Sequence, residues 1–242
     1  MPKLDFALQF EKNTEALGGI PVVIVAAGSA SRMQGIDKMF APLCGIPILA
    51  VTLRAFENCP FVSEITVVTR KEKISDVLKL GRSYAVSKLK NVVEGGDCRE
   101  ASVKNGVMLY NGKCDKILIH DGARPLVTSA VIERTAKGLN DYDSVTCAVK
   151  LKDTVKKIDP QGKVIETPDR TSLVSVQTPQ GVKVSEFLRI LEEYDPSNFT
   201  DDTSVMEAGG YATYTVEGDY TNIKVTTPED IVVAEVFLGK EW

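Results

Sequence analysis

Four basic residues and one acidic residue stand at positions where charged groups can act on a phosphate-bearing ligand. Arg32 and Lys38 follow the first apolar run of the chain, Asp121 and Arg124 follow a later one, and Lys224 precedes the last predicted helix. Lysine and arginine neutralise phosphate oxygens, and aspartate is a good ligand for Mg²⁺ beside phosphates. Together these residue types are the set needed to bind a polyphosphate and a divalent metal.

The chain contains one histidine, His120, and this limits the chemistry further. Metal sites built from several histidines are excluded, and Ser-His-Asp catalysis is possible only if His120 is the base. Because His120 lies on an apolar run, we interpret it as a core histidine and not as a general base. A nucleophile that is already ionised, such as a phosphate monoester, needs no base. The residues therefore favour nucleotidyl transfer onto a phosphate, catalysed by positioning and charge neutralisation.

The segment Ala26–Met33 (AAGSASRM) is a candidate phosphate-binding loop. Its small residues allow backbone N–H groups to approach an anion closely, and Arg32 adds positive charge. It matches neither the GxGxxG pattern of dinucleotide-binding proteins nor the GxxxxGK[ST] pattern of P-loops. The alternative is an ordinary strand-to-helix turn with solvated cations.

Three further candidates have structural alternatives of their own. The paired glycines of Glu94–Ser102 (EGGDCREAS) allow close approach of a ligand, but Asp97 could equally cap the following helix. Asp121 could be a turn residue satisfied by backbone N–H groups. Lys224, in the otherwise apolar stretch IKV, could extend its amine to solvent.

Short β-branched runs that alternate with longer helical patterns must position these residues. Such alternation predicts an α/β fold, with a Rossmann-like, mostly parallel sheet covered by helices on both faces. Ligands of such sheets bind outside the carboxyl ends of the strands. The predicted strands are 21–26, 64–69, 91–93, 116–120, 144–149, 212–216 and 222–225; the predicted helices are 47–57, 73–84, 100–109, 130–139, 182–194, 201–208 and one that opens at Thr227.

The segment Lys150–Arg170 interrupts this alternation. It places an Asp-Pro-Gln-Gly turn between two polar, β-rich halves, which predicts a β-hairpin with too few large apolar residues to belong to the core. We interpret it as a projecting arm, and because an isolated hairpin is marginal in water, the arm needs a partner surface. Its cations could also be a solvated hairpin face. We expect residues 1–20 to be an N-terminal extension and residues 21–242 to be one domain that includes the arm.

Composition sets limits on the class of protein. The 242 residues carry a net charge of -4, which disfavours broad nucleic-acid binding. No apolar run approaches the roughly 20 residues of a membrane span, and the first 20 residues do not resemble a secretory signal. The five cysteines form no CxxC pair, so we expect reduced, mostly buried thiols in a cytoplasmic protein.

Eight segments between residues 21 and 238 form one ordered set: AAGSASRM with Lys38, EGGDCREAS, IHDGARP, KDTVK, TPDR, VQTPQ, TDDTSVME and EGDYTNIKVTTPED. In order and spacing they resemble the 2-C-methyl-D-erythritol 4-phosphate cytidylyltransferase family. The resemblance implies CTP and the methylerythritol phosphate as substrates, Mg²⁺ as cofactor, and CDP-methylerythritol and pyrophosphate as products. It also implies a homodimer in which the arm crosses to the other subunit.

The resemblance also implies roles for individual residues. Arg32, Lys38 and Lys224 would be catalytic, stabilising charge around the α-phosphorus, and Asp121 would place the metal. Arg124 would support the site, while Thr154 and Arg170 on the arm would bind the phosphate of the second substrate. The triphosphate loop would contain Ala26, Ala27, Gly28 and Ser29, and the cytidine would be held by Gly96, Asp97 and Ser102.

The chain departs from the family's usual pattern at three positions, where it has Ala30, Asp37 and Thr221. None of the three removes a charged catalytic group, so they bear on local loop geometry and not on the reaction.

Two other interpretations of the function stay open. A ribitol 5-phosphate cytidylyltransferase would share CTP binding and differ in the acceptor, and a non-catalytic nucleotide-binding module would bind CTP without releasing pyrophosphate.

Overall fold

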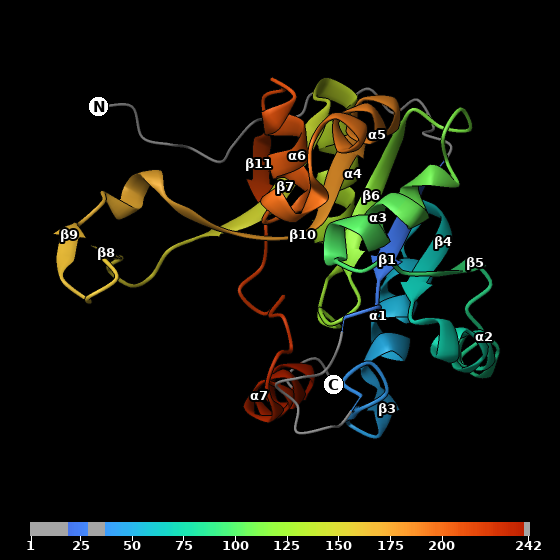
Figure 1. Cartoon of the computed structure of the whole chain (residues 1–242). Helices are drawn as coiled ribbons and strands as arrows, with labels where there is room; N and C mark the ends of the chain where they lie inside the picture. The colour runs from blue at the N-terminus through green and yellow to red at the C-terminus, as the bar shows by residue number, and fades with distance from the viewer. Residues whose placement is uncertain (1–18, 29–36, 240–242) are drawn as a thin grey trace.

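A mixed sheet of seven strands, in the order β11-β7-β10-β6-β1-β4-β5, runs through the molecule (Figure 1). The structure is a computed structural model and describes residues 19–28 and 37–239. Ser29, Arg32 and the predicted N-terminal extension up to residue 18 lie outside the described residues. The strands are β1 (Ile20–Val25), β4 (Val62–Thr69), β5 (Leu89–Glu94), β6 (Lys116–Asp121), β7 (Ser144–Lys150), β10 (Val174–Lys183) and β11 (Tyr214–Glu217).

Six of these strands point the same way, and β10 points the opposite way. The pairs β1–β4, β1–β6, β4–β5 and β7–β11 are parallel, whereas β10 is antiparallel to both of its neighbours, β6 and β7. The carboxyl ends of β1 and β6 therefore meet at one edge of the sheet. The prediction of a mostly parallel sheet is confirmed.

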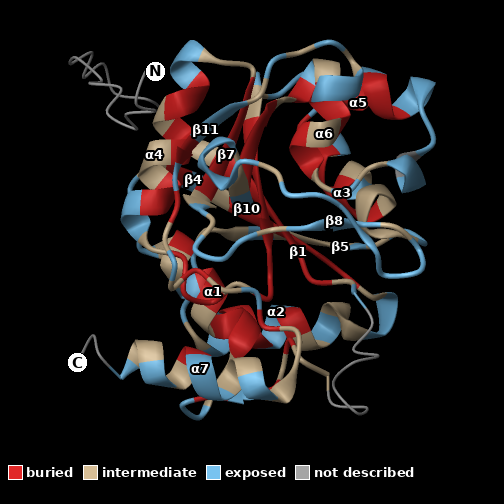
Figure 2. Cartoon of the chain, turned by 90° about the vertical axis from the view of Figure 1, so that its left-hand side faces the viewer, coloured by how far each residue is buried: buried red, intermediate tan, exposed pale blue. Residues whose placement is uncertain are grey.

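Helices cover both faces of the sheet, as the sequence predicts (Figure 2). One apolar cluster joins the sheet to α1, α2 and α4, and a second joins it to α3, α5 and α6. Successive residues of β1 alternate between them, because neighbouring side chains of a strand point to opposite faces. The helices are α1 (Ile48–Glu57), α2 (Ile74–Ser83), α3 (Arg99–Met108), α4 (Ser129–Asp141), α5 (Val184–Glu193), α6 (Asp202–Ala208) and α7 (Pro228–Leu238), with short 3₁₀ turns at Lys71–Lys73, Arg170–Ser172 and Pro196–Asn198.

A third, smaller cluster packs α7 against a two-stranded hairpin of β2 (Pro42–Leu43) and β3 (Ile46–Pro47).

No helix in residues 19–28 and 37–239 is both long and apolar enough to cross a membrane. All five cysteines are free thiols, but only Cys59 and Cys147 are buried, so the expectation of mostly buried thiols is wrong.

Two strand assignments from the sequence need correction. The strand β10, the longest in the described part of the chain, is missing from the sequence prediction, and it contains Pro179, a residue type that is unusual in central strands. Pro179 is tolerated since it lies where the β7–β10 register shifts between Val176 and Gln180. Residues 222–225 are not a strand but a loop, which is anchored by a hydrogen bond from the Val225 N–H to the Ala123 carbonyl, 2.8 Å long.

The predicted arm is present as a projecting hairpin of β8 (Lys157–Ile158) and β9 (Val164–Glu166), which extends away from the sheet (Figure 1). Every residue of the two strands is exposed, and Gly162 donates to the Asp159 carbonyl across the turn. The arm leaves the carboxyl end of β7 and returns at Val174, which pairs with Lys150. It therefore emerges from the same edge of the sheet at which β1 and β6 end.

Gly106 lets α3 lie close to the sheet, and replacing it tests this packing. A Cβ at this position would approach Val23 to 2.6 Å and Val68 to 2.7 Å, and both valines are fully buried. We expect Gly106→Ala to lower the free energy of unfolding by about 1–2 kcal/mol, because overpacking against stiff β-branched side chains outweighs the gain of about 1 kcal/mol in helix propensity. Denaturant titration measures the change.

The matched control is Met108→Ala, two positions later on the exposed side of the same helix, where the side chain is 42% exposed. We expect it to change the free energy of unfolding by no more than about 0.5 kcal/mol. Equal stability of Gly106→Ala and the native chain would show that α3 can move outward without cost.

Candidate functional site

A cleft of about 390 Å³ lies at the edge where β1 and β6 end. Its walls come from the ends of these two strands, the start of α3 and the loop before α7. Among residues 19–28 and 37–239, the charged side chains in its walls are those of Lys38, Asp97, Arg99, Asp121 and Lys224. The other lining residues are Val25, Ala27, Gly28, Met39, Gly96, Cys98, Ser102 and Ala123.

Asp121, the last residue of β6, is the centre of the charge arrangement. It is 7% exposed, and its carboxylate lies 2.8 Å from Lys224 Nζ, 3.4 Å from Arg99 Nη2 and 3.6 Å from Arg124 Nε. Burial on its own raises the pKa of this carboxyl, but the charges of Arg99, Lys224 and Arg124 outweigh it and hold the pKa well below its usual range. Asp121 is therefore ionised, and it is more than a turn residue satisfied by backbone N–H groups.

Arg99 was not identified from the sequence, although it links two buried carboxylates. Its two terminal nitrogens each donate to one oxygen of Asp202 over 2.8 Å, and its Nε and Nη2 also lie 3.4 Å from Asp121 Oδ1. Although burial lowers the pKa of Arg99, the charge of Asp202 raises it overall. A signal was available: a cation in the first turn of a helix opposes the helix dipole and needs a nearby acid.

His120 is fully buried and belongs to the core, which confirms the sequence interpretation. Its Nε2 lies 3.1 Å from the Arg124 carbonyl, its Nδ1 lies 3.0 Å from Thr178 Oγ1, and its ring packs on Phe56 with centroids 4.7 Å apart. Burial lowers the pKa of His120 to about 3, so the ring is neutral. Since both ring nitrogens have partners inside the protein, neither is available as a general base.

The glycine loop before α3 is held in place by Ser102. The Ser102 hydroxyl accepts from the Gly96 N–H over 3.0 Å and donates to the Cys98 carbonyl over 2.9 Å. A Cβ on Gly95 would lie 2.6 Å from the Cβ of Ala27, so this loop and the end of β1 are in close contact. The helix cap is Cys98, whose sulfur accepts from the Ala101 N–H, and the alternative role of Asp97 as cap is wrong.

The remaining predicted residues fall into four groups. Lys38, Ala27 and Gly28 line the cleft, whereas Ala26 is buried and donates its N–H to the Val68 carbonyl. Arg124 stands beside Asp121, as expected of a supporting cation. Thr154 and Arg170 are exposed on the arm and are not brought to this cleft within one chain; the Arg170 guanidinium donates to the Lys152 carbonyl. Ser29 and Arg32 lie outside the described residues.

The charges suit a polyanion that carries a divalent cation. Around the cleft, four cationic side chains (Lys38, Arg99, Arg124 and Lys224) face three acidic ones (Asp97, Asp121 and Asp202) in the described part of the chain. Within that part, no group of three His, Cys, Asp or Glu side chains could hold a metal by itself. Magnesium is commonly held by one or two carboxylates together with substrate phosphates, so Asp121 fits that mode of binding.

A larger cleft of about 460 Å³ lies between α1, α7 and the loop before α4. Most of its lining side chains are apolar, and Arg54 is its charged residue among those the structure describes. It therefore lacks the mixed charges that a phosphate and a metal require, and the cleft at Asp121 is the candidate active site.

Comparison with known proteins points to one family. The profile of the 2-C-methyl-D-erythritol 4-phosphate cytidylyltransferases matches residues 20–240. A protein of that name from Clostridium botulinum is 41% identical over 222 residues, which are 90% of this chain and 97% of the relative. One from Caldanaerobacter subterraneus is 38% identical over 228 residues, 91% and 99% of the two chains. A solved 4-diphosphocytidyl-2C-methyl-D-erythritol synthase from Anaerococcus prevotii superposes with a TM-score of 0.81 at 30% identity, covering 92% of this chain and 97% of that one.

The Arg99–Asp202 pair gives a test of how strongly the site depends on charge compensation. Asp202 is 1% exposed, so Arg99→Met leaves a buried carboxylate without its main partner, and we expect a loss of about 3–5 kcal/mol in the free energy of unfolding. We expect Asp202→Asn to cost less, because Arg99 is partly exposed and keeps Asp121 nearby.

The two changes together complete a double-mutant cycle, measured by denaturant titration. We expect the double variant to be more stable than the sum of the single losses predicts, by about 1–3 kcal/mol. Losses that add to within about 0.5 kcal/mol would mean that the two side chains stabilise the fold independently.

Proposed function

The chain belongs to the 2-C-methyl-D-erythritol 4-phosphate cytidylyltransferase family, and on that premise we propose that the cleft at Asp121 is its active site. The protein is a CTP-dependent nucleotidyltransferase that transfers the cytidylyl group of CTP to 2-C-methyl-D-erythritol 4-phosphate in isoprenoid precursor synthesis. The products are CDP-methylerythritol and pyrophosphate. The observation that carries the assignment of the site is the ionised Asp121 among three cations at the carboxyl end of a parallel strand.

The nucleotide would bind between the two glycine-containing loops. Ala27 and Gly28 at the end of β1 present small side chains to the cleft, so a triphosphate can approach the backbone there. Gly96 and Asp97 lie exposed at the cleft on the other side, where they would contact the cytidine. Ser102, whose hydroxyl is bonded to Gly96 and Cys98, would shape this loop and thereby support the cytidine.

The reaction needs charge stabilisation more than proton transfer. The acceptor phosphate is already largely ionised at neutral pH, with a second pKa of about 6, so it can attack the α-phosphorus of CTP without a base. A new P–O bond forms as the bond to pyrophosphate breaks, and negative charge builds on the α-phosphoryl oxygens. Lys38 and Lys224 line the cleft and would stabilise that charge, together with Arg32.

Asp121 is the carboxylate that would hold Mg²⁺ in this cleft. A bound Mg²⁺ would neutralise phosphate charge and polarise the α-phosphoryl group. Lys224 contacts one oxygen of Asp121 at 2.8 Å, whereas Arg99 lies 3.4 Å from the other oxygen. Asp121 thus has an oxygen that is less tightly engaged and can serve a metal.

The arm would complete the site of a second subunit in a homodimer. Thr154 and Arg170 are exposed on the arm, and the arm emerges from the same sheet edge as the cleft. Exposed Ile158, Val164 and Ile165 on its strands give it apolar surface for a partner. In this arrangement Thr154 and Arg170 would bind the phosphate of methylerythritol phosphate in the other subunit.

We also propose residues 21–242 as one nucleotidyltransferase domain in a cytoplasmic enzyme, with residues 1–20 as an extension.

The function is tested by pyrophosphate release from CTP with each candidate acceptor. We expect release with 2-C-methyl-D-erythritol 4-phosphate, and little with ribitol 5-phosphate or with no acceptor. Preference for ribitol 5-phosphate would reassign the acceptor. Tight CTP binding without release in either case would indicate a non-catalytic nucleotide-binding protein.

Replacing Lys224 tests the proposed stabilisation of the transition state. We expect Lys224→Ala to lower kcat by about 10²–10³-fold and to weaken CTP binding much less, because the amine acts on charge that grows during the reaction. Steady-state kinetics and calorimetric CTP titration separate the two effects. Lys90→Ala, an exposed lysine on β5, is the control, and near-normal turnover of Lys224→Ala would remove Lys224 from the catalytic set.

Subunit exchange tests the crossed arm. Arg32→Ala and Arg170→Ala are each expected to be inactive, but a mixed dimer has one site in which both arginines are intact. With random exchange about half of the dimers are mixed, so activity should recover to roughly a quarter of the native level. Activity is measured after mixing, and exchange is verified by tagging one parent.

If Arg170 instead serves the cleft of its own chain, every site in every dimer has one lesion. Demonstrated exchange without recovered activity would therefore contradict the crossed arm. That result would leave the cytidylyl-transfer activity itself unaffected.

A further inference from the structure

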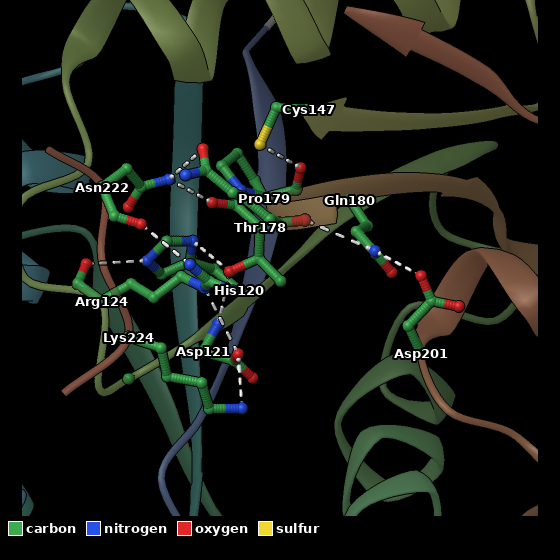
Figure 3. A network of polar contacts seen from close by, with 12 residues as sticks. His120, Asp121, Arg124, Cys147, Thr178, Pro179, Gln180, Asp201, Asn222 and Lys224 are labelled. Carbon is green, nitrogen blue, oxygen red and sulfur yellow. Dashed lines mark hydrogen bonds and ion pairs between the residues drawn. The ribbon is translucent and has the colours of Figure 1, made fainter. Parts of the chain in front are cut away.

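His120 has no part in the proposed chemistry, yet it lies next to Asp121 at the centre of a polar network (Figure 3). The Asp121 N–H donates to Thr178 Oγ1 over 3.0 Å, and the same hydroxyl lies 3.0 Å from His120 Nδ1. On its other side, His120 Nε2 lies 3.1 Å from the Arg124 carbonyl oxygen. The imidazole therefore spans the turn that follows β6 and connects it to β10.

The directions of these hydrogen bonds follow from the partners. The Arg124 carbonyl can only accept, so Nε2 must carry the proton. A neutral imidazole has a single N–H, and Nδ1 is then an acceptor for the Thr178 hydroxyl. That hydroxyl in turn uses a lone pair to accept from the Asp121 N–H. The contacts thus fix which group donates and which accepts in each hydrogen bond, and they define one tautomer of His120.

Asn222 extends the network to the loop that carries Lys224. The Arg124 guanidinium donates to the Asn222 carbonyl over 2.8 Å, and the Asn222 side-chain amide donates to the Thr178 carbonyl over 2.9 Å. The hydrogen bonds therefore form a closed ring through Thr178, His120, Arg124 and Asn222 (Figure 3). Asn222 and His120 are fully buried, so water cannot easily replace either partner.

We propose that His120 is a positioning residue: in its Nε2–H tautomer it closes a ring of hydrogen bonds that fixes Asp121, Arg124 and Lys224 relative to one another. Asp121 and Arg124 lie on the turn that the imidazole spans, and Lys224 lies two residues beyond Asn222. The ring thus joins β6, β10 and the loop before α7, three segments far apart in the sequence. Partners of this kind around metal-binding groups commonly change activity by about 10–100-fold when they are removed.

The tautomer can be observed directly, because His120 is the only histidine of the chain. Proton–nitrogen correlation NMR of the untagged, isotope-labelled protein gives a single imidazole pattern. We expect a proton on Nε2 and an unprotonated Nδ1 shifted by its hydrogen bond. Thr178→Val should remove that hydrogen-bond shift, and Thr178→Ser should keep it. A proton on Nδ1, or an Nδ1 signal that Thr178→Val leaves unchanged, would overturn the proposal.

The kinetic test rests on the proposed function. We expect Thr178→Val to lower kcat for methylerythritol phosphate by about 10–100-fold and to raise the Mg²⁺ concentration for half-maximal rate, with little change in CTP affinity. Thr178→Ser should recover most of the turnover, since it keeps the hydroxyl. Thr135→Val is the matched control: Thr135 is buried like Thr178, but its hydroxyl donates within α4 to the Val131 carbonyl.

The control separates positioning from simple stability. Both valine variants should melt at lower temperature, but assayed well below that temperature Thr135→Val should turn over like the native enzyme. Equal turnover of folded Thr178→Val and Thr135→Val would overturn the proposal. If the native protein releases no pyrophosphate with any acceptor, the proposed function fails, and the NMR measurement still decides the question of the ring.

Discussion

A buried carboxylate at the end of a parallel strand is the constraint around which this molecule is organised. Asp121 is almost inaccessible, and an uncompensated charge there would be very costly. Three cations compensate it, and each comes from a different segment: Arg99 from the start of α3, Arg124 from the turn after β6, and Lys224 from the loop before α7. The position of these segments is therefore tied to the charge state of one side chain.

The antiparallel strand β10 makes this convergence possible. Because β10 lies between β6 and β7, its Thr178 reaches the end of β6, where the hydroxyl accepts from the Asp121 N–H. Its Gln180 accepts from the backbone N–H of Asp202, so the strand also places the acid that holds Arg99. Six strands that point one way bring the loops to a common edge, and the seventh supplies the polar contacts that hold them there.

The sequence predicts the layers of this fold better than it predicts the contacts of its site. Apolar runs such as those of β1 and β6 identify buried strands directly, and the charged residues after them locate the edge where a ligand binds. Two features escape that reasoning. Pro179 makes β10 look unlike a central strand, although a register shift accommodates it, and Arg99 looks like a surface residue of a helix. Its partner Asp202 lies 103 residues away, and a pairing over that separation is visible only once the chain has folded.

The same arrangement explains how the site can operate without a base. A general base must exchange protons with the substrate, but the one histidine is buried, neutral and bonded through both nitrogens. An acceptor that arrives as an ionised phosphate removes that need, and what remains is to hold two polyanions together against their mutual repulsion. That task requires cations of fixed position, and fixed cations require buried acids and hydrogen-bonded turns to hold them. The rigid network around Asp121 is thus the physical counterpart of a reaction in which charge, and not proton transfer, is the main barrier.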